Sequence, residues 1–550
     1  MELINQHTKA IMEGCKERAK DAGLNFQTET LEYVVTNRDL LELSPKVMIP
    51  TLYDYWVHDV EVLKEKGKYE LYPSNPFETV INTRPAISFY NDNNPDWLNV
   101  MIFYHVIAHI DFFQNNLNFA HTWDYDFTGQ ALSDKRMIAN LRLEHGRWVD
   151  YVIEFARAID NIVGFHDELA MINRPTDSGI SAMLNYYFDV FLQKEKKVKT
   201  NAYLAEVERY NAARQEHGSL GETQFFSEAN QKYPEMEALF KRHESVKERR
   251  AVDLLQYLMD NSEFLNRAEN KWMISILEVV RKTSIFFQPQ IRTKIMNEGW
   301  ASYWHETLFL KDDRISSHEV EFARVNAYVT SLPRVGLNPY ALGMRLFYDI
   351  EERADRGKLS MAFDRLEDAH HRCHYDADTK KGKETIFNVR QNYSDFMYVN
   401  TFIDQAFVDR HKLFVSGKRM NKERMVWEYY VKSRKASDYR QMIIDTLYHP
   451  PKIEVCEEKT TEKELYLNHK FEGKPLVKDY IANTMLGIEY LWGGPVHLET
   501  SEPTFSPASP KAAAPVSAAT YIQETKEKRD VKWHRFLYTM KKRSLSKKFI

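Results

Sequence analysis

Two histidines and one glutamate, on segments far apart in the chain, have the residue types and spacing of a metal site. His105 and His109 are four residues apart, so on a helix their imidazoles project from the same face, one turn apart. Glu298 could supply a third ligand, and His305, seven residues further on, returns to its helix face as a fourth candidate. Nitrogen and oxygen ligands of this kind suit zinc or another divalent transition metal, which is the expected cofactor.

Hydrolysis at such a metal also requires a general base beside the water, and the sequence offers that base less clearly. In the HExxH arrangement the base is the glutamate directly after the first histidine, whereas here that position is Val106. Glu306 and Asp111 are the remaining candidates for this catalytic role. Asp111 follows His109 by two residues, which turns it away from that histidine around a helix, so it could instead orient a neighbouring group.

A purely structural interpretation of these residues stays open. Two histidines on an aromatic-rich helix are often buried and hydrogen-bonded without a metal, and the aromatic residues around Glu298 could simply form a packed face. Gly299 favours something more specific, because a glycine inside a helix costs about 1 kcal/mol relative to alanine and indicates close approach of another segment. A second group of histidines, at residues 370–374, lies in a charged segment and is predicted to be a surface feature.

The candidate ligands must be positioned by two helices. Asn94 is a candidate cap, and Pro95 a candidate first helical residue, for a helix that carries both histidines and ends near residue 117. Glu298 lies in a helix predicted over residues 291–310. Other predicted elements are helices over residues 7–22, 52–68, 136–172 and 269–287, the last closed by Pro289, a strand over 79–83, and a turn at 333–340 that opens a helix containing Gly343.

The pattern changes past residue 385, where β-rich stretches at 452–456 and 464–467 predict a small α+β domain over residues 400–497. Residues 202–260 combine many charged residues with heptad-like apolar positions, which predicts a charged helical arm on a helical core of residues 1–399. The predicted fold class is therefore mainly α with a smaller α+β C-terminal region, and with a zincin-like metal site between two helices.

The last part of the chain has a different composition. Residues 498–520 are rich in proline, alanine and serine, cannot bury a core, and are predicted to be a linker. Residues 521–550 form a basic amphipathic tail, with lysines and arginines interleaved with aromatic residues. We expect this tail to be a solvated helix, or a helix that docks a protein partner, rather than a contact for membrane or nucleic acid.

The overall composition limits the classes of protein. The 550 residues carry 75 basic and 79 acidic side chains, a formal net charge of −4, so no overall charge draws the chain to nucleic acid or anionic lipid. Its three cysteines form no CxxC pair, which excludes a disulfide framework and a cysteine zinc site. No window approaches the roughly 18 uncharged apolar residues of a spanning helix, so we expect a cytoplasmic protein without a transmembrane segment.

Four stretches are distinctive in combination: residues 105–116, which run from the histidine pair into FFQNN; residues 280–305, which contain MNEGWASYWH; GLNPYALG at 336–343; and KETIFNVR at 383–390. In this order they resemble the SpoVR-like family, the stage V sporulation protein R group, over roughly residues 30–497. Ala108 stands where the family's glycine is expected, and residues 200–250 are less similar. The resemblance implies a cytoplasmic bacterial factor associated with spore cortex formation, from a family also present in bacteria that do not sporulate.

A looser similarity is to gluzincin metallopeptidases, in which a histidine pair on one helix and a glutamate followed by small residues on another bind zinc. The missing HExxH glutamate limits this similarity to the geometry of the site. Together the resemblances imply a role in cell-envelope (peptidoglycan) formation, and our first hypothesis is a metal-dependent hydrolase of amide-type bonds. The alternative is a non-enzymatic regulatory or scaffold protein, in which the histidines and glutamate form a buried hydrogen-bond network and the basic tail docks a partner.

Overall fold

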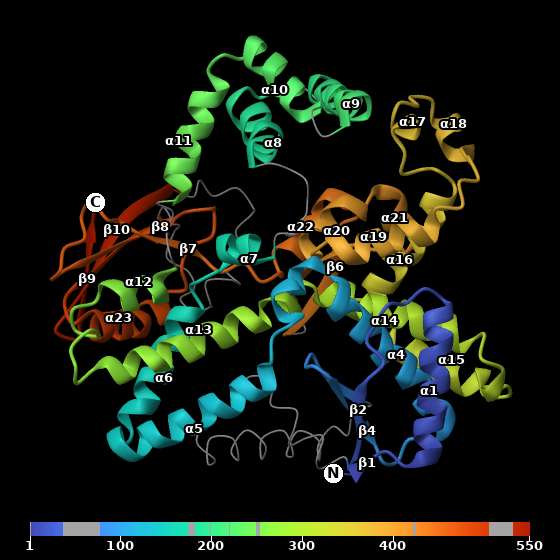
Figure 1. The fold of residues 1–550 in the computed structure, drawn as a ribbon, viewed down its shortest axis with the longest axis horizontal. Coiled ribbons are helices and arrows are strands. Elements are labelled where there is room, and N and C mark those ends of the chain that lie inside the picture. The colour runs from blue at the N-terminus through green and yellow to red at the C-terminus, as the bar shows by residue number, and fades with distance from the viewer. Residues whose placement is uncertain are drawn as a thin grey trace. The chain divides into compact units, whose positions relative to one another are not determined.

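The computed structural model describes residues 2–36, 78–173, 182–198, 200–218, 221–248, 253–421, 425–504 and 532–550, so the helix predicted over 52–68 lies outside the described residues. Contacts divide the chain into two units, residues 1–173 with 258–550 and residues 174–257. The first unit is built mainly from helices and contains the predicted metal-site residues (Figure 1).

Helix α4 (Asp96–Asn115) lies at the centre of the first unit, and every residue from Leu98 to Phe113 is buried. A helix that is apolar on all sides is typical of a core position, because it has no face suited to water. Helices α1 (Gln6–Asp21) and α14 (Lys294–Phe309) pack against α4. The helix begins one residue later than predicted, since Pro95 rather than Asn94 occupies the cap position.

Helix α16 (Pro339–Asp355) crosses α14 with the two backbones in contact. A Cβ added to Gly299 would lie 2.4 Å from the backbone of Gly343, and one added to Gly343 would lie 2.1 Å from the carbonyl oxygen of Ile295. This confirms the predicted close approach at Gly299. Asn338 begins α16, because its side-chain oxygen accepts a hydrogen bond from the backbone N–H of Ala341.

The other helices of the first unit surround this core: α5 (Phe127–His145), α6 (Trp148–Asp160), α7 (His166–Ile172), α13 (Lys271–Arg292), α15 (Glu319–Val329), α17 (Met361–Asp364), α18 (Ala369–His374), α19 (Gly382–Asn392), α20 (Asp395–Phe402), α21 (Gln405–Arg410) and α22 (Ala436–Ile444), with short 3-10 turns η1 (Leu117–Thr122) and η4 (Asp313–Ile315). The single helix predicted over 136–172 was wrong, because Gly146, at φ +59°, ends α5.

The predicted end of the helix before Pro289 was also wrong, because Pro289 lies inside α13. The Ile285 carbonyl, which proline cannot hydrogen-bond, is instead 3.0 Å from Nε2 of His121.

A four-stranded sheet at the N-terminal end has the strand order β1 (Glu2–Leu3), β2 (Thr30–Val35), β4 (Ala86–Asn91) and β3 (Glu78–Ile81). Strands β2 and β4 are parallel, and the other two pairs are antiparallel. The strand predicted from the β-branched run beginning at Thr79 is confirmed as β3.

The second unit contains α8 (Ala182–Asn185), a π-helix η2 (Tyr186–Glu195), α9 (Thr200–His217), α10 (Gly221–Lys232) and α11 (Met236–Glu248), and α12 (Leu254–Asn261) spans its C-terminal limit in the sequence. It has its own aromatic core, in which Tyr187 and Phe225 meet edge to face with ring centroids 5.6 Å apart. The charged arm predicted near 202–260 falls largely within this unit, which begins earlier in the chain.

After residue 410 the chain forms a two-stranded hairpin, β5 (Val415–Asn421) with β6 (Val426–Ser433), and then a five-stranded sheet. The order in this sheet is β11 (Ser544–Phe549), β10 (Lys532–Lys541), β9 (Val496–Thr504), β8 (Leu465–Lys470) and β7 (Lys452–Val455), with helix α23 (Lys478–Trp492) between β8 and β9 in sequence. Only β8 and β9 pair in parallel. The fold is therefore mainly helical with a sheet-containing C-terminal region, as predicted.

The end of the chain departs from the prediction. The helix expected within residues 521–550 was wrong, because the described residues 532–550 form strands β10 and β11. Phe536, Tyr538 and Met540 alternate along β10 with the period of a strand, and Tyr538 and Met540 are buried. The predicted linker also begins too early, since residues 498–504 belong to β9. Of the helices in the described ranges, none has the length and hydropathy needed to span a membrane.

Candidate metal centre

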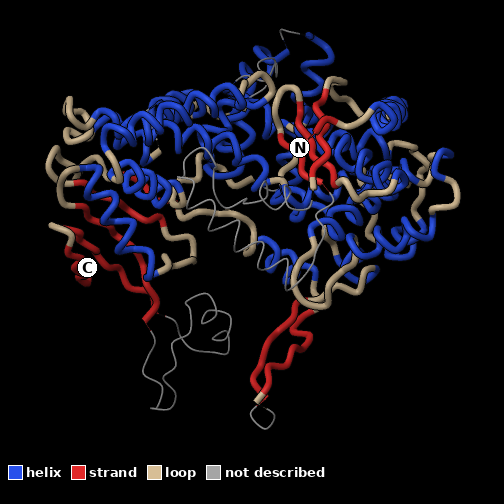
Figure 2. The backbone as a smooth tube through the Cα atoms, turned by 90° about the horizontal axis from the view of Figure 1, so that it is seen from below, coloured by secondary structure: helices blue, strands red, loops and turns tan. Residues whose placement is uncertain are grey.

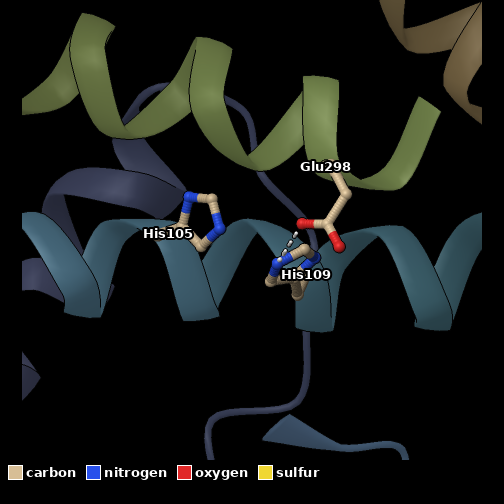
Figure 3. A group of neighbouring side chains, drawn as sticks. All are labelled: His105, His109 and Glu298. Atoms are coloured by element: carbon tan, nitrogen blue, oxygen red, sulfur yellow. Dashed lines mark ion pairs between the residues drawn. The ribbon is translucent and has the colours of Figure 1, made fainter. Parts of the chain in front are cut away.

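The three predicted ligands meet between α4 and α14. One ligand atom each from His105, His109 and Glu298 lies within 4.8 Å of the other two, although the residues come from helices almost two hundred positions apart (Figure 3). His105 approaches His305 while His109 approaches Glu298, so α14 runs antiparallel to α4. Both histidines are only 5% exposed, and the Glu298 side chain is 17% exposed. The helical spacing places the two histidines on one face of α4, and the packing of α14 on α4 brings Glu298 to them.

The neighbouring amide fixes the protonation of His109. Its Nδ1 lies 2.9 Å from the side-chain oxygen of Asn297, and an amide oxygen can only accept, so Nδ1 carries the proton. In a neutral His109 ring, the other nitrogen, Nε2, then presents a lone pair to Oε2 of Glu298, 3.6 Å away. That oxygen is buried and has no hydrogen-bond partner among the described residues. Two acceptors face each other here, an arrangement that is unfavourable unless a cation or a proton lies between them.

A hydrogen-bonded chain likewise orients His105. The Nδ2 of Asn326 donates to Glu306, so its Oδ1 must accept from Nε2 of His305, 3.0 Å away. Nδ1 of His305 is then unprotonated and accepts from Nδ1 of His105, at 2.8 Å. In a neutral His105 ring this arrangement leaves Nε2 unprotonated, and the ring also has a hydrogen bond with the backbone of Ala301. The His105 ring also stacks on Tyr340, with centroids 6.0 Å apart and planes tilted by 16°.

Burial keeps the imidazoles of His105 and His305 neutral. It lowers the pKa of His105 well below the ordinary value, and the nearby charges of His109 and His305 lower it further. Burial also lowers the pKa of His305 to about 4, although its hydrogen bond with Asn326 opposes the shift. Only a neutral imidazole can donate a lone pair to a metal, so these pKa shifts favour ligation rather than oppose it.

The fourth predicted ligand and the two predicted bases lie elsewhere. His305 is fully buried beside His105, but both of its nitrogens are used in the chain from His105 to Asn326, so it orients a ligand instead of joining the group. Glu306 accepts hydrogen bonds from Asn326, at 2.5 Å, and from the hydroxyl of Tyr348, at 3.1 Å. A general base must reach the reacting water, and Glu306 reaches the ligand group only through Asn326 and His305.

Asp111 is directed away from His109, as its helical position predicts. Its carboxylate accepts hydrogen bonds from the backbone N–H of Asn25, at 2.8 Å, and from Nε1 of Trp300, at 2.9 Å. The Nε of Arg390 lies 3.4 Å away as an ion-pair partner. Burial raises the pKa of Asp111 to about 6, despite the opposing effects of Arg390 and the hydrogen bonds. These contacts make it a structural carboxylate and not a base.

Three residues at the site were not predicted. Asn297 and Asn326 set the tautomers of the two histidines, and only the first had a sequence signal, since it directly precedes Glu298. Asp395 accepts hydrogen bonds from the backbone N–H groups of Ile295 and Met296 and so caps the start of α14. Burial raises the pKa of Asp395 to about 7, and the nearby Glu298 contributes to that rise.

The other histidine-rich segments do not join the site. His370, His371 and His374 are exposed on α18, which agrees with the surface position predicted for them. His166 lies beside His449, with ring centroids 6.0 Å apart, and His449 pairs with the exposed Glu472. In the described ranges, His105, His109 and Glu298 are the group whose ligand atoms converge on one position.

Comparison with known proteins identifies a matching family but finds no matching solved structure. Residues 2–449 match the family model described as SpoVR like protein. The Uncharacterized protein YcgB of Escherichia coli (strain K12) is 27% identical over 338 residues, which are 58% of this chain and 58% of YcgB. The chain thus spans less than two thirds of that relative's length. No solved structure matches the chain.

Proposed function

The chain belongs to the SpoVR-like family, and from the geometry of its buried cluster we propose that His105, His109 and Glu298 bind one divalent transition-metal ion. We propose further that this centre hydrolyses an amide-type bond, in cell-envelope (peptidoglycan) precursors or peptides. Zinc fits the ligand set best, because two imidazoles and one carboxylate are the ligands of many hydrolytic zinc sites. The envelope role rests on the family resemblance and the metal on the geometry.

One observation carries the metal proposal. Oε2 of Glu298 is buried without a hydrogen-bond partner in the described chain and faces the unprotonated Nε2 of His109 at 3.6 Å. A cation between the two atoms would turn an unfavourable contact between acceptors into two coordination bonds. In neutral rings, the hydrogen bonds of His109 with Asn297 and of His105 with His305 would leave the lone pair of each histidine on Nε2. These donors and their orientation support the proposal, since a metal binds deprotonated imidazole nitrogens.

The hydrolytic part of the proposal follows from the number of ligands. Three protein ligands leave a coordination position for water, and the ion would lower the pKa of that water and polarise an amide carbonyl. Addition of water across the C–N bond yields a carboxylic acid and an amine. The residues of the chain orient both imidazoles, keep His105 neutral, and exclude bulk water by burial. Val106 stands in the place of the HExxH glutamate, so proton transfer must follow a different route from that of HExxH peptidases.

The first test is metal content, measured by inductively coupled plasma mass spectrometry on protein purified without a histidine tag or chelator. We expect near one metal ion per chain, lost in folded variants His105→Ala, His109→Ala and Glu298→Ala. His469→Ala is a matched control, because His469 is also buried but bonds to Thr500 in the C-terminal sheet. Its metal content should equal that of wild type.

The metal-loaded protein would then be incubated with peptidoglycan fragments and assayed for newly released amines, with the Glu298→Ala variant as the blank.

A second candidate function is a regulatory or scaffold protein without catalysis. The observation in its favour is that both candidate bases are hydrogen-bonded elsewhere, Glu306 to Asn326 and Tyr348, and Asp111 to Asn25 and Trp300. Absence of bound metal, persisting after incubation with zinc, iron and manganese, would support this candidate. Stoichiometric metal without amine release would retain the metal centre and reject the hydrolase.

A further inference from the structure

The hairpin formed by β5 and β6 is exposed on both faces along most of its length. Figure 2 shows it as a pair of strands that extends away from the helices. Only its base is anchored, where Val415 packs against the main core and β5 contacts α22. A two-stranded hairpin is marginally stable in water by itself, so one that keeps large apolar side chains exposed is expected to bind something.

The strand register assigns the side chains to two faces. Met420 pairs with Trp427, Lys418 with Tyr429 and Ser416 with Val431, so these six side chains share one face. On that face, the exposed fractions are 42% for Met420, 46% for Trp427, 57% for Tyr429 and 45% for Val431. The Nζ of Lys418 lies 4.4 Å from the centre of the Trp427 ring. This surface, which we call the aromatic face, is mainly apolar, with one cation, Lys418, in the middle of it.

The opposite face is more mixed: it carries the exposed side chains of Val426 and Tyr430 together with polar residues that pair with one another. Glu428 accepts a hydrogen bond from Asn421, at 2.7 Å, and forms an ion pair with Arg419, at 3.4 Å. The Tyr430 ring lies directly over Gly417, where a Cβ would come within 2.4 Å of it. The difference between the two faces indicates that the aromatic face is the one available to a partner.

The charge around the hairpin is strongly positive, in contrast to the nearly neutral chain. The described residues 415–421 and 425–435 contain five basic residues, Lys418, Arg419, Lys432, Arg434 and Lys435, and one acidic residue, Glu428. Glu428 is already paired within the hairpin. At the end of the hairpin, Met425 is 76% exposed and Val426 48% exposed. Lys418 and Arg419 lie along the strands and the other three cations at the base. Apolar side chains together with nearby cations are the combination found where proteins enter the interface of an anionic bilayer.

We propose that the aromatic face and tip of the β5–β6 hairpin insert into the headgroup region of an anionic lipid membrane. Trp427 and Tyr429 have the amphipathic rings that favour this region, and the lysines and arginines would contact lipid phosphates. Basic and aromatic residues also occur in nucleic-acid sites, but the aliphatic members of the patch, Met420, Met425 and Val431, gain from contact with acyl chains and not from stacking on bases. The proposal is independent of the metal centre.

Flotation of the full chain with lipid vesicles tests the proposal. Wild type should float with vesicles of phosphatidylcholine and phosphatidylglycerol, weakly or not at all with phosphatidylcholine alone, and less as salt is raised. The double variant Trp427→Ser/Tyr429→Ser should lose about tenfold or more in vesicle partitioning. Its matched control is Tyr328→Ser/Tyr480→Ser, which removes two exposed aromatic side chains far from the hairpin in sequence. Tyr328 on α15 is 80% exposed and Tyr480 on α23 is 69% exposed. This control should float like wild type.

Three outcomes would overturn the proposal. In the first, wild type fails to float with anionic vesicles; in the second, wild type and the hairpin variant float equally. In the third, the variant loses oligonucleotide binding or self-association and not vesicle binding. Fluorescence anisotropy of a labelled single-stranded oligonucleotide detects loss of nucleic-acid binding, and light scattering of the eluted protein detects loss of self-association. A thermal melt of each variant shows that it is folded, and the charge variant Lys432→Glu/Lys435→Glu should weaken flotation without altering the aromatic face.

Discussion

Two carboxylates at the contact between α4 and α14, the buried Asp111 and the partly buried Glu298, have opposite surroundings. Asp111 receives a backbone N–H and an indole N–H, and the Arg390 guanidinium faces it. Glu298 leaves Oε2 without a hydrogen-bond donor among the described residues and turns it toward an unprotonated histidine nitrogen. One carboxylate has hydrogen-bond donors within the protein, whereas the other has an oxygen that only the His109 ring approaches, at 3.6 Å.

The difference separates structural from functional polar groups more reliably than residue type does. Both carboxylates were candidates by sequence. Asp111 lies two residues after His109 on α4, and Glu298 approaches His109 from α14. A carboxylate with complete hydrogen bonds stabilises the fold and has no capacity left for chemistry. A buried acceptor beside another acceptor costs stability and persists where it has a use.

The largest effect is expected for Asp111→Ala. Removal of this carboxylate leaves the buried Arg390 guanidinium unpaired, which should lower the free energy of unfolding by about 3–5 kcal/mol. Metal content should stay near that of wild type, because the carboxylate faces away from the ligand group. Urea unfolding and metal analysis of the same preparation provide both values. Asp313→Ala is the control, since that carboxylate is 85% exposed and should matter little. A folded Asp111→Ala protein that has lost its metal would mean that the two regions are not separate.

The second effect concerns the residue that orients His109. Asn297→Ala removes the acceptor for Nδ1–H and permits the other tautomer, so metal affinity should fall about 10–100-fold. Competition with a chromophoric chelator measures that affinity. Asn392→Ala, at an exposed position of α19, should bind like wild type. Equal affinities for the two variants would contradict the assigned tautomer.

Asp312, a third carboxylate, resembles Asp111 in having hydrogen-bond donors within the protein, and it extends the comparison to pH. Burial alone would raise the pKa of Asp312, but hydrogen bonds from Arg314 and Tyr104 outweigh it and lower the pKa to about 2. A lowered carboxylate pKa stabilises the folded state above pH 4, and this contribution is lost as pH falls from about 4 to about 2. The stability advantage of wild type over Asp312→Asn should therefore shrink by about 1 kcal/mol by pH 3 and about 2 kcal/mol in full. An advantage that stays constant between pH 6 and pH 3 in urea titrations would show that the pKa is not lowered.

The two helices and the convergence of His105, His109 and Glu298 could be predicted because they depend on local spacing. A four-residue step places two side chains on one helix face, and the cost of Gly299 pointed to a close crossing. The partners that set the tautomers could not be predicted. Asn326 comes from α15 and meets His305 only through tertiary packing, which leaves no periodic signal in the sequence.

The same limit explains the errors. Glu306 follows His305 directly and was a reasonable base, but its direction is decided by Asn326 and Tyr348 from other helices. At the end of the chain, the basic residues were weighted above the two-residue alternation of Phe536, Tyr538 and Met540, which is the stronger signal for a strand. Local periodicity was informative in both cases, whereas the choice between competing polar partners depends on contacts across the fold.

The smallest and most decisive effect is expected for Glu298→Gln in metal-free protein. The amide can turn its NH₂ group toward Nε2 of His109 and replace a contact between two acceptors with a hydrogen bond. Unfolding free energy should stay equal or rise by about 1 kcal/mol, although metal binding is lost. Glu306→Gln is the matched control on the same helix. Its carboxylate accepts two hydrogen bonds, so the same substitution should destabilise the protein.

The sign of the Glu298→Gln effect distinguishes the two explanations of the cluster. If His109 were an imidazolium paired with Glu298, the substitution would leave a buried cation without its counter-charge and lower stability by about 3–5 kcal/mol. If the two atoms are both acceptors awaiting a cation, the substitution relieves their repulsion. Urea unfolding of chelator-treated wild type and variant at pH 7 measures the sign directly. A large loss would make Glu298 a counterpart of Asp111 and remove the main argument for a metal at this position.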